Sequence, residues 1–276
     1  MTEAIIGLGA LGVLFGALLA YASKVLAIEV DEREEAILNI LPGANCGGCG
    51  YPGCGGYAAA VAKGEAGVDS CPVGGMGLAN QIGVIMGLEA ESGVKRIAVV
   101  KCRGDKNIAP ARFRYEGIKT CQAANDVGNG FKGCTYGCLG LGDCMAACPF
   151  DAIEMGENNL PIINAEKCVS CGKCVIACPR NIIELIPEDK KVHVLCNSYA
   201  KGATVRKVCQ EGCIACRICM KNCPVDAIVI ENNIAVIDYD KCINCGICAS
   251  KCPMNTIENT KKKKPKAEIK TEAKAQ

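Results

Sequence analysis

The longest apolar stretch of the chain lies near its N-terminus. Residues 4–23 carry no charge and are mostly aliphatic, and about 20 such residues can span a bilayer as a helix. A cleaved signal peptide is the alternative, because Ala-Tyr-Ala at 20–22 resembles a cleavage site, but no positive charge precedes the run. The pattern favours a retained membrane anchor. Glu3 lies before the run and Lys24 after it, so the positive-inside rule puts the body of the chain in the cytoplasm.

Shorter apolar stretches farther along the chain predict two small hairpins. Residues 152–155 and 161–163 flank an Asn-rich turn, and residues 227–230 and 234–237 do the same. A Pro-x-Asp-Ala-Ile sequence begins both hairpins, which indicates that one segment has been duplicated. Since internal repeats set the architecture, the sequence predicts two related modules.

Cysteine dominates the composition, with 24 of 276 residues. Three runs have the spacing C-x2-C-x2-C-x3-C-P, and a fourth is stretched to C-x3-C-x5-C-x3-C-P. This is the ligand pattern of bacterial [4Fe–4S] ferredoxins, in which the fourth cysteine of a run binds the cluster of the partner run. Crossing the ligands in this way predicts four sites: Cys134, Cys138, Cys144 and Cys178; Cys168, Cys171, Cys174 and Cys148; Cys213, Cys216, Cys219 and Cys252; and Cys242, Cys245, Cys248 and Cys223.

The duplication also relates cysteines of the two copies. The first four cysteines of the first copy, Cys134, Cys138, Cys144 and Cys148, lie 75 residues before Cys209, Cys213, Cys219 and Cys223, and by this offset Cys121 matches Cys196. Leu141 takes the place of Cys216, so Cys134 is the expected fourth ligand in the first copy. Its own counterpart, Cys209, is displaced by Cys216 in the second copy.

A separate cysteine group lies between the apolar run and the first hairpin. Glycines surround these cysteines and allow the backbone to approach a cluster closely, and the pattern at 57–63 predicts a short helix that Gly64 ends. A structural zinc site has similar spacing, but the ferredoxin-type runs downstream favour a fifth [4Fe–4S] cluster. The group consists of Cys46, Cys49, Cys54 and Cys71.

A disulfide scaffold and zinc sites are the alternatives for the whole cysteine content. Neither predicts three runs with ferredoxin spacing and a following proline, so the spacing favours clusters. Four cysteines fall outside the patterns, and buried free thiols, then local disulfides, are favoured for them over a sixth cluster. They are Cys102, Cys121, Cys196 and Cys209.

Charge and the remaining motifs narrow the function. The formal net charge is +2, but residues 260–276 hold seven lysines and two glutamates, a composition typical of a disordered solvated tail. The sequence has no phosphate loop, no nicotinamide or flavin fingerprint in a valid context, no nucleophile–His–acid set and no nucleic-acid-binding domain. The chain is therefore expected to carry electrons between partners and to have no catalytic site of its own.

These patterns predict an α+β chain with an N-terminal transmembrane helix, a small [4Fe–4S] domain and two tandem ferredoxin-like modules with two clusters each. The predicted segments are 1–28 (anchor), 29–88 ([4Fe–4S] domain), 89–130 (connection), 131–190 (first module), 191–208 (connection), 209–259 (second module) and 260–276 (tail).

This order of motifs resembles that of the B subunits of the Rnf complexes. The resemblance rests on Cys-Gly-Gly-Cys-Gly-Tyr-Pro-Gly-Cys at 46–54, on Gly-Cys-Leu-Gly-Leu-Gly-Asp-Cys at 137–144 and on the order of the domains over 1–258. Rnf complexes are membrane-bound, ion-translocating ferredoxin:NAD+ oxidoreductases of bacteria. The resemblance implies the inner (cytoplasmic) membrane as location, other Rnf subunits as partners, and electron transfer from reduced soluble ferredoxin to the membrane subunits. The two modules resemble the longer forms of anaerobic bacteria.

Two other functions share part of the pattern. A membrane-tethered polyferredoxin serving another reductase or hydrogenase would have the same runs, although the cluster domain beside the apolar run argues against it. An iron–sulfur sensor would have a single labile cluster and an effector or nucleic-acid domain, and five cluster sites do not suit it.

Overall fold

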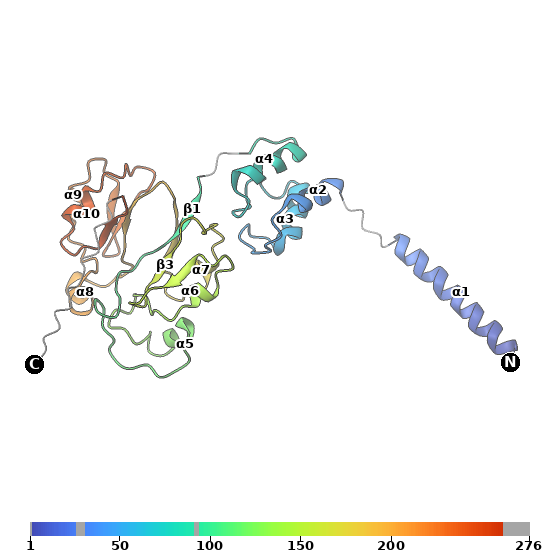
Figure 1. Ribbon diagram of the computed structural model, residues 1–276, viewed down its shortest axis with the longest axis horizontal. Helices are drawn as coiled ribbons and strands as arrows, with labels where there is room; N and C mark the ends of the chain where they lie inside the picture. Colours follow the sequence, from blue (N-terminus) through green and yellow to red (C-terminus); the bar gives the residue numbers. More distant parts are fainter. Residues whose placement is uncertain (1, 26–30, 91–93, 262–276) are drawn as a thin grey trace, which may run out of the picture.

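The computed structural model describes residues 2–25, 31–90 and 94–261 (Figure 1). Helix α1 (Thr2–Val25) covers the apolar run. Among the described residues, no helix is long and apolar enough to cross a membrane. Most of the predicted lysine-rich tail lies outside the described residues.

Residues 31–90 form a small helical unit. Helix α2 (Glu32–Ile40) begins after Asp31, whose carboxylate accepts a backbone N–H of the first turn. Helix α3 (Gly53–Ala62) begins earlier than the sequence predicted and ends just before Gly64, which has a positive φ. Helix α4 (Gly75–Met86) ends at a left-handed glycine. The largest fully buried side chains of this unit are those of Tyr57, Ile37 and Ile82.

Both predicted hairpins are present, one in each module. Strands β2 and β3 form the first and strands β6 and β7 form the second. The bounds are β2 (Ile153–Met155), β3 (Pro161–Ile163), β6 (Ile228–Glu231) and β7 (Ile234–Ile237).

Two further antiparallel pairs close the modules, and the sequence did not indicate them. Strand β1 (Arg96–Val100) pairs with β4 (Ile183–Pro187), and β5 (Val192–Val194) pairs with β8 (Ile257–Asn259). β1 and β5 lie in the segments 89–130 and 191–208, which the sequence treats as connections. Their partners lie far along the chain, so no hairpin turn marks the pairing.

The short helices repeat in the same order in both modules. Figure 1 shows α6 and α7 beside β3 in one module and α9 and α10 together in the other. These four are single turns inside the cysteine runs, and this mixed content agrees with the predicted α+β class. The bounds are α5 (Cys121–Asp126), α6 (Asp143–Ala146), α7 (Lys173–Ile176), α8 (Gly202–Val208), α9 (Ile218–Lys221) and α10 (Ile247–Lys251).

Candidate metal centres

One backbone turn recurs in all four cysteine runs. Two residues with positive φ bracket a single position, which is Cys171, Cys216 or Cys245 in three of the runs. Left-handed residues in such turns direct successive backbone N–H groups into a concavity, an arrangement that occurs at many iron–sulfur sites. The bracketing pairs are Gly140 and Gly142, Ser170 and Gly172, Ala215 and Arg217, and Asn244 and Gly246.

A second turn follows the last cysteine of every run. The chain continues as Cys-Pro-x-Asp or Cys-Pro-x-Asn, and the acidic or amide residue has a φ between 48° and 51°. Asp and Asn tolerate this left-handed conformation because their short side chains form local hydrogen bonds. The turn directs the chain from the cysteine loop into a strand. The four residues are Asp151, Asn181, Asp226 and Asn255.

In the second module four thiols surround one cavity, which has about 360 Å³ of empty space including its opening. Apolar side chains such as Val194 and Ile257 form its wall. All four thiols come from the two cysteine runs, and Cys216 occupies the bracketed position. The four are Cys213, Cys216, Cys219 and Cys252.

In the first module a different segment supplies one thiol. Leu141 occupies the bracketed position, so this loop lacks a sulfur there. The Cys121 sulfur, at the start of α5, instead accepts the Leu141 N–H, and the Cys121 N–H donates to Asp143 Oδ1 at 2.7 Å. The cavity has about 370 Å³ of empty space. Its four thiols are those of Cys121, Cys138, Cys144 and Cys178.

The sequence had placed Cys134 in this set, and the structure puts it on another cavity. The physical reason is that Cys121 already fills the fourth position. The missing cysteine at 141 did indicate that a thiol must come from elsewhere, but it pointed to Cys134, which is nearer in the sequence. No spacing pattern favours Cys121, because its place depends on the contact between the start of α5 and Asp143.

The partner runs keep their thiols close together in the protein core. Cys168 and Cys174 are buried, and Cys148 packs against the same core. Burial, with a contribution from the nearby Cys168 and Cys171 sulfurs, raises the pKa of Cys174 to about 12. The structure brings together the corresponding thiols of the second module: Cys223, Cys242, Cys245 and Cys248.

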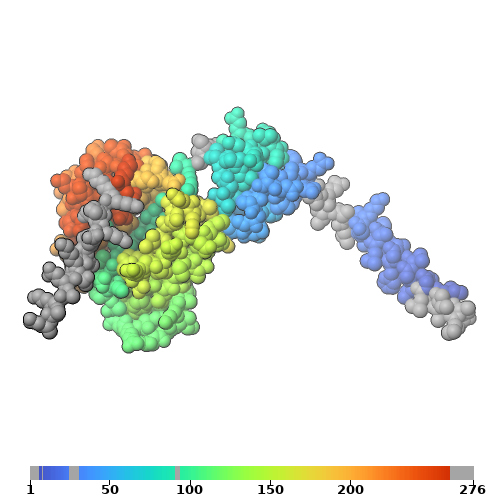
Figure 2. Space-filling view, in the orientation of Figure 1, coloured from blue at the N-terminus to red at the C-terminus, as the bar shows by residue number. Residues whose placement is uncertain are grey.

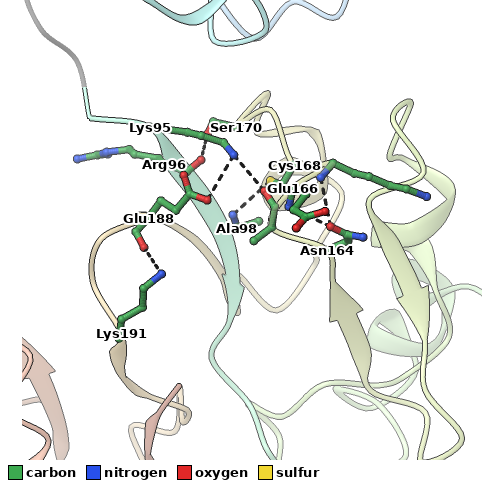
Figure 3. A network of polar contacts seen from close by, with 11 residues as sticks. Lys95, Arg96, Ala98, Asn164, Glu166, Cys168, Ser170, Glu188 and Lys191 are labelled. Carbon is green, nitrogen blue, oxygen red and sulfur yellow. Dashed lines mark hydrogen bonds and ion pairs between the residues drawn. The ribbon is translucent and has the colours of Figure 1, made fainter. Parts of the chain in front are cut away.

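Strand β1 supports the Cys168 loop from outside the run (Figure 3). The Ala98 N–H donates to Cys168 Sγ at 3.5 Å. Lys95 Nζ donates to the Ala165 carbonyl at 3.1 Å and lies 3.4 Å from a carboxylate oxygen of Glu188. A segment that the sequence treats as a connection thus positions a candidate ligand.

The N-terminal unit has a four-thiol cavity of its own, with about 290 Å³ of empty space. Asn45 Oδ1 accepts the Cys54 N–H at 2.8 Å, and Gly53 allows this approach because a Cβ there would lie 2.8 Å from the same oxygen. The cavity is lined by Cys46, Cys49, Cys54 and Cys71.

The thiols suit a cluster in number and in chemistry. Among the described residues, no three or more His, Cys, Asp or Glu side chains are arranged so that they could hold a metal ion; the thiols surround cavities in sets of four. A [4Fe–4S] cluster takes four thiolate ligands. Burial raises the pKa of Cys138 to about 12 and that of Cys144 to about 11, so these two thiols are neutral when free and lose their protons when they bind iron.

A further cavity lies against residues of both modules. It is lined by Cys102, Cys134, Cys196 and Cys209. The match of Cys121 with Cys196, taken from the 75-residue offset, is wrong in the structure. Cys102 is the counterpart, because the sulfurs of Cys102 and Cys196 accept equivalent N–H groups, from Cys138 and Cys213, at 3.3 Å each.

Comparison with known families agrees with these sites. Residues 41–73 match the family described as "Putative Fe-S cluster", and residues 235–258 match "4Fe-4S binding domain". Residues 133–183 and 167–227 match two families that are both described as "4Fe-4S dicluster domain". The fold and the sites define an iron–sulfur electron-transfer protein with several [4Fe–4S] domains.

Relatives that align over most of the chain define the family. The chain is 51% identical, over 85% of its length and 70% of the relative, to the B subunit of the Na(+)-translocating ferredoxin:NAD(+) oxidoreductase complex of Acetobacterium woodii. It is 45% identical, over 85% of its length and 89% of the relative, to the B subunit of the ion-translocating oxidoreductase complex of Methanosarcina acetivorans. It is 44% identical, over 83% of its length and 81% of the relative, to the B subunit of the proton-translocating ferredoxin:NAD(+) oxidoreductase complex of Clostridium ljungdahlii. The chain belongs to this family, the B subunits of the Rnf complexes, and the resemblance seen in the sequence is confirmed.

Proposed function

We propose that this protein carries electrons from reduced ferredoxin to the membrane subunits of an Rnf complex. [4Fe–4S] clusters bound to the thiol sets would supply the one-electron chemistry, and the chain holds the thiolates in place. The proposed ligand sets are Cys46, Cys49, Cys54 and Cys71; Cys121, Cys138, Cys144 and Cys178; Cys148, Cys168, Cys171 and Cys174; Cys213, Cys216, Cys219 and Cys252; and Cys223, Cys242, Cys245 and Cys248.

The observation that carries the proposal is the contact between neighbouring thiol sets. A Cβ added to Gly48 would lie 3.0 Å from Cys171 Cα, so a ligand loop of the N-terminal unit touches a ligand loop of the first module. In Figure 2 the blue and teal N-terminal unit lies against the yellow part of this module. Within each module the runs exchange their fourth cysteine, which makes the two sites adjacent. Adjacent sites support a series of one-electron steps.

The two modules of this series differ in exposure. Cys216 and Cys245 of the second module are exposed, whereas Cys121 and Cys171 of the first module are partly covered. Arg217 beside Cys216 is exposed as well. A soluble ferredoxin can approach the second module most closely, so electrons enter there and leave through the N-terminal unit.

Anchoring at the cytoplasmic face of the inner membrane belongs to the same proposal. Its support is the uncharged, mostly aliphatic run at 4–23, which precedes the N-terminal unit and its thiol cavity. Ion movement is assigned to other subunits, since this run has no charged side chain. Relatives of similar identity are named for Na+ and for protons, which agrees with that division of roles.

Reconstitution of the complex with and without this protein tests the function. Ferredoxin-dependent NAD+ reduction should be lost without it and return when the cluster-loaded chain is added. An unchanged rate of ferredoxin oxidation in the complex that lacks it would contradict the proposal.

The docking site is tested by Arg217→Glu in the full complex. The variant should raise the KM for ferredoxin while the iron content stays the same. Arg206→Glu is the matched control, because Arg206 is an exposed arginine of the same module, on α8. Equal effects of the two variants would point to net charge and away from docking at Cys216.

A further inference from the structure

Four thiols that no ferredoxin pattern groups together line a cavity between the two modules. Cys134, Cys196 and Cys209 are buried, and all four cysteines are free of disulfides. The cavity has about 370 Å³ of empty space, the same as the four-thiol cavity of the first module. The four thiols are those of Cys102, Cys134, Cys196 and Cys209.

Each module contributes one of these thiols from the same structural position, just after its first strand. Cys102 follows β1, and Cys196 follows β5, two residues after the last strand residue in both cases. The residue before each cysteine makes an equivalent backbone hydrogen bond. The Lys101 N–H donates to the Ile182 carbonyl at 2.6 Å, and the Leu195 N–H donates to the Thr256 carbonyl at 2.8 Å. With the matching N–H bonds to both sulfurs from Cys138 and Cys213, the two thiols form a pair related by the duplication.

Each module also contributes the first cysteine of its first run. Cys134 and Cys209 are 75 residues apart, the repeat distance. Each is left over from its own module, because Cys121 or Cys216 completes the cavity there. The four thiols are therefore two duplicated pairs, and the site has the internal symmetry of the chain.

Glycines line the places where this cavity meets the sulfurs. A Cβ on Gly137 would lie 3.6 Å from Cys134 Sγ, and a Cβ on Gly212 would lie 3.5 Å from Cys209 Sγ. These glycines are also 75 residues apart. A Cβ on Gly104 would lie 3.5 Å from the Cys102 sulfur and 3.8 Å from the Cys209 sulfur. Sulfurs of the two modules thus approach one point next to bare backbone, as a bulky inorganic cluster requires.

A buried cation balances charge beside the site. Lys132 is 4% exposed, and its Nζ donates to the Gly104 carbonyl at 2.5 Å. Buried charges are costly unless they are paired. The Asp105 carboxylate already lies near this lysine, and thiolates bound to a cluster would add further negative charge beside it.

We propose that Cys102, Cys134, Cys196 and Cys209 bind a sixth [4Fe–4S] cluster between the two modules. Zinc would also accept four thiolates. However, this cavity has nearly the same volume as the four-thiol cavities of the two modules, which lie in segments that resemble [4Fe–4S] domains. The binding of this cluster does not depend on the proposed electron route. Its role as a carrier between the modules does rest on that route.

The test counts iron and acid-labile sulfide in the full-length chain purified without oxygen. The wild type should contain about 24 of each, and Cys134→Ser or Cys209→Ser about 20, because one four-iron cluster is lost. The double variant should also contain about 20, since both residues bind the same cluster. Cys54→Ser combined with Cys134→Ser should contain about 16, because those residues bind different clusters.

Three results would overturn the proposal. The first is about 20 irons in the wild type, and the second is one zinc ion per chain. The third is that the single variant Cys138→Ser and the double variant Cys138→Ser/Cys134→Ser contain the same amount of iron. The last result would return Cys134 to the cluster of the first module. If the variants do not fold, anomalous scattering of the native chain at the iron edge decides. The anomalous map should show an iron peak between the modules. The absence of that peak would contradict the sixth cluster without contradicting the other five proposed sites.

Discussion

The two ferredoxin-like modules are copies that complete their first thiol cavity in different ways. The second uses Cys216, at a position bracketed by two left-handed residues. The first keeps the same bracket around Leu141 and takes a sulfur from Cys121 on α5. The backbone turn is therefore common to both copies, whereas the thiol comes from whichever segment reaches the turn. A ligand loop is better identified by its backbone than by its cysteine.

The largest expected effect comes from changing which residue supplies the fourth thiol of the first module. Cys121→Ser should remove one cluster, about four irons per chain, because the cavity keeps only three thiols. Adding Leu141→Cys should restore it, since this places a thiol where the second module has Cys216. Iron and sulfide analysis with electron paramagnetic resonance of the reduced chain measures both changes.

Leu141→Cys alone is the control, and it should leave the iron content at the wild-type value. A Cys121→Ser chain that retains all its iron would show that Cys121 is not a ligand. A failure of Leu141→Cys to restore the cluster would mean that the shared turn is not sufficient to place a sulfur.

The modules also differ in what covers their second site. Cys171 meets the N-terminal unit at Gly48, whereas its counterpart Cys245 is exposed. Gly48→Ala would place a Cβ 2.9 Å from Pro72 Cγ and 3.0 Å from Cys171 Cα, and such overpacking costs about 1–3 kcal/mol. We expect the loops to separate and the N-terminal cluster to be reduced several-fold more slowly, as measured by rapid mixing with reduced ferredoxin.

Gly77→Ala is the matched control for this contact. A Cβ there meets nothing within 4 Å, so reduction should proceed at the wild-type rate. Equal rates for Gly48→Ala and Gly77→Ala would show that electrons do not pass between these two loops.

A third difference concerns one lysine. Lys132 is buried beside Cys102 and Cys138, and its counterpart 75 residues later, Lys207, is exposed. A nearby positive charge favours the reduced, more negative state of a cluster. Lys132→Met should therefore lower the reduction potential of a first-module cluster by tens of millivolts, as measured by redox titration. Lys207→Met should shift nothing, because water screens an exposed charge, and equal shifts for both variants would refute the role of burial.

Cysteine spacing carried most of the information about the site, and the two hairpins followed from short apolar stretches on either side of an Asn-rich turn. What the sequence did not reveal depends on contacts between distant segments. Cys196 follows Cys102 by 94 residues while Cys209 follows Cys134 by 75, so the first copy holds 19 extra residues between its two cysteines. The insertion contains α5 and Cys121, and it shifted the alignment by which the sequence paired Cys121 with Cys196. The pairings of β1 and β5 were missed because their partners are the last strands of each module.

The smallest expected effect concerns a hydrogen bond that only the second module has. His193 in β5 is buried, and its Nδ1 lies 3.0 Å from Tyr239 Oη; the first module has Val99 and Ala165 at these places. Tyr239→Phe leaves the buried imidazole without this partner, so the second module should lose about 1–2 kcal/mol of unfolding free energy. Anaerobic denaturant titration followed by cluster absorbance measures it, and the iron content should not change. Tyr115→Phe removes an exposed bond to the Ile118 carbonyl and should cost clearly less, so equal losses would show that burial does not strengthen the His193–Tyr239 pair.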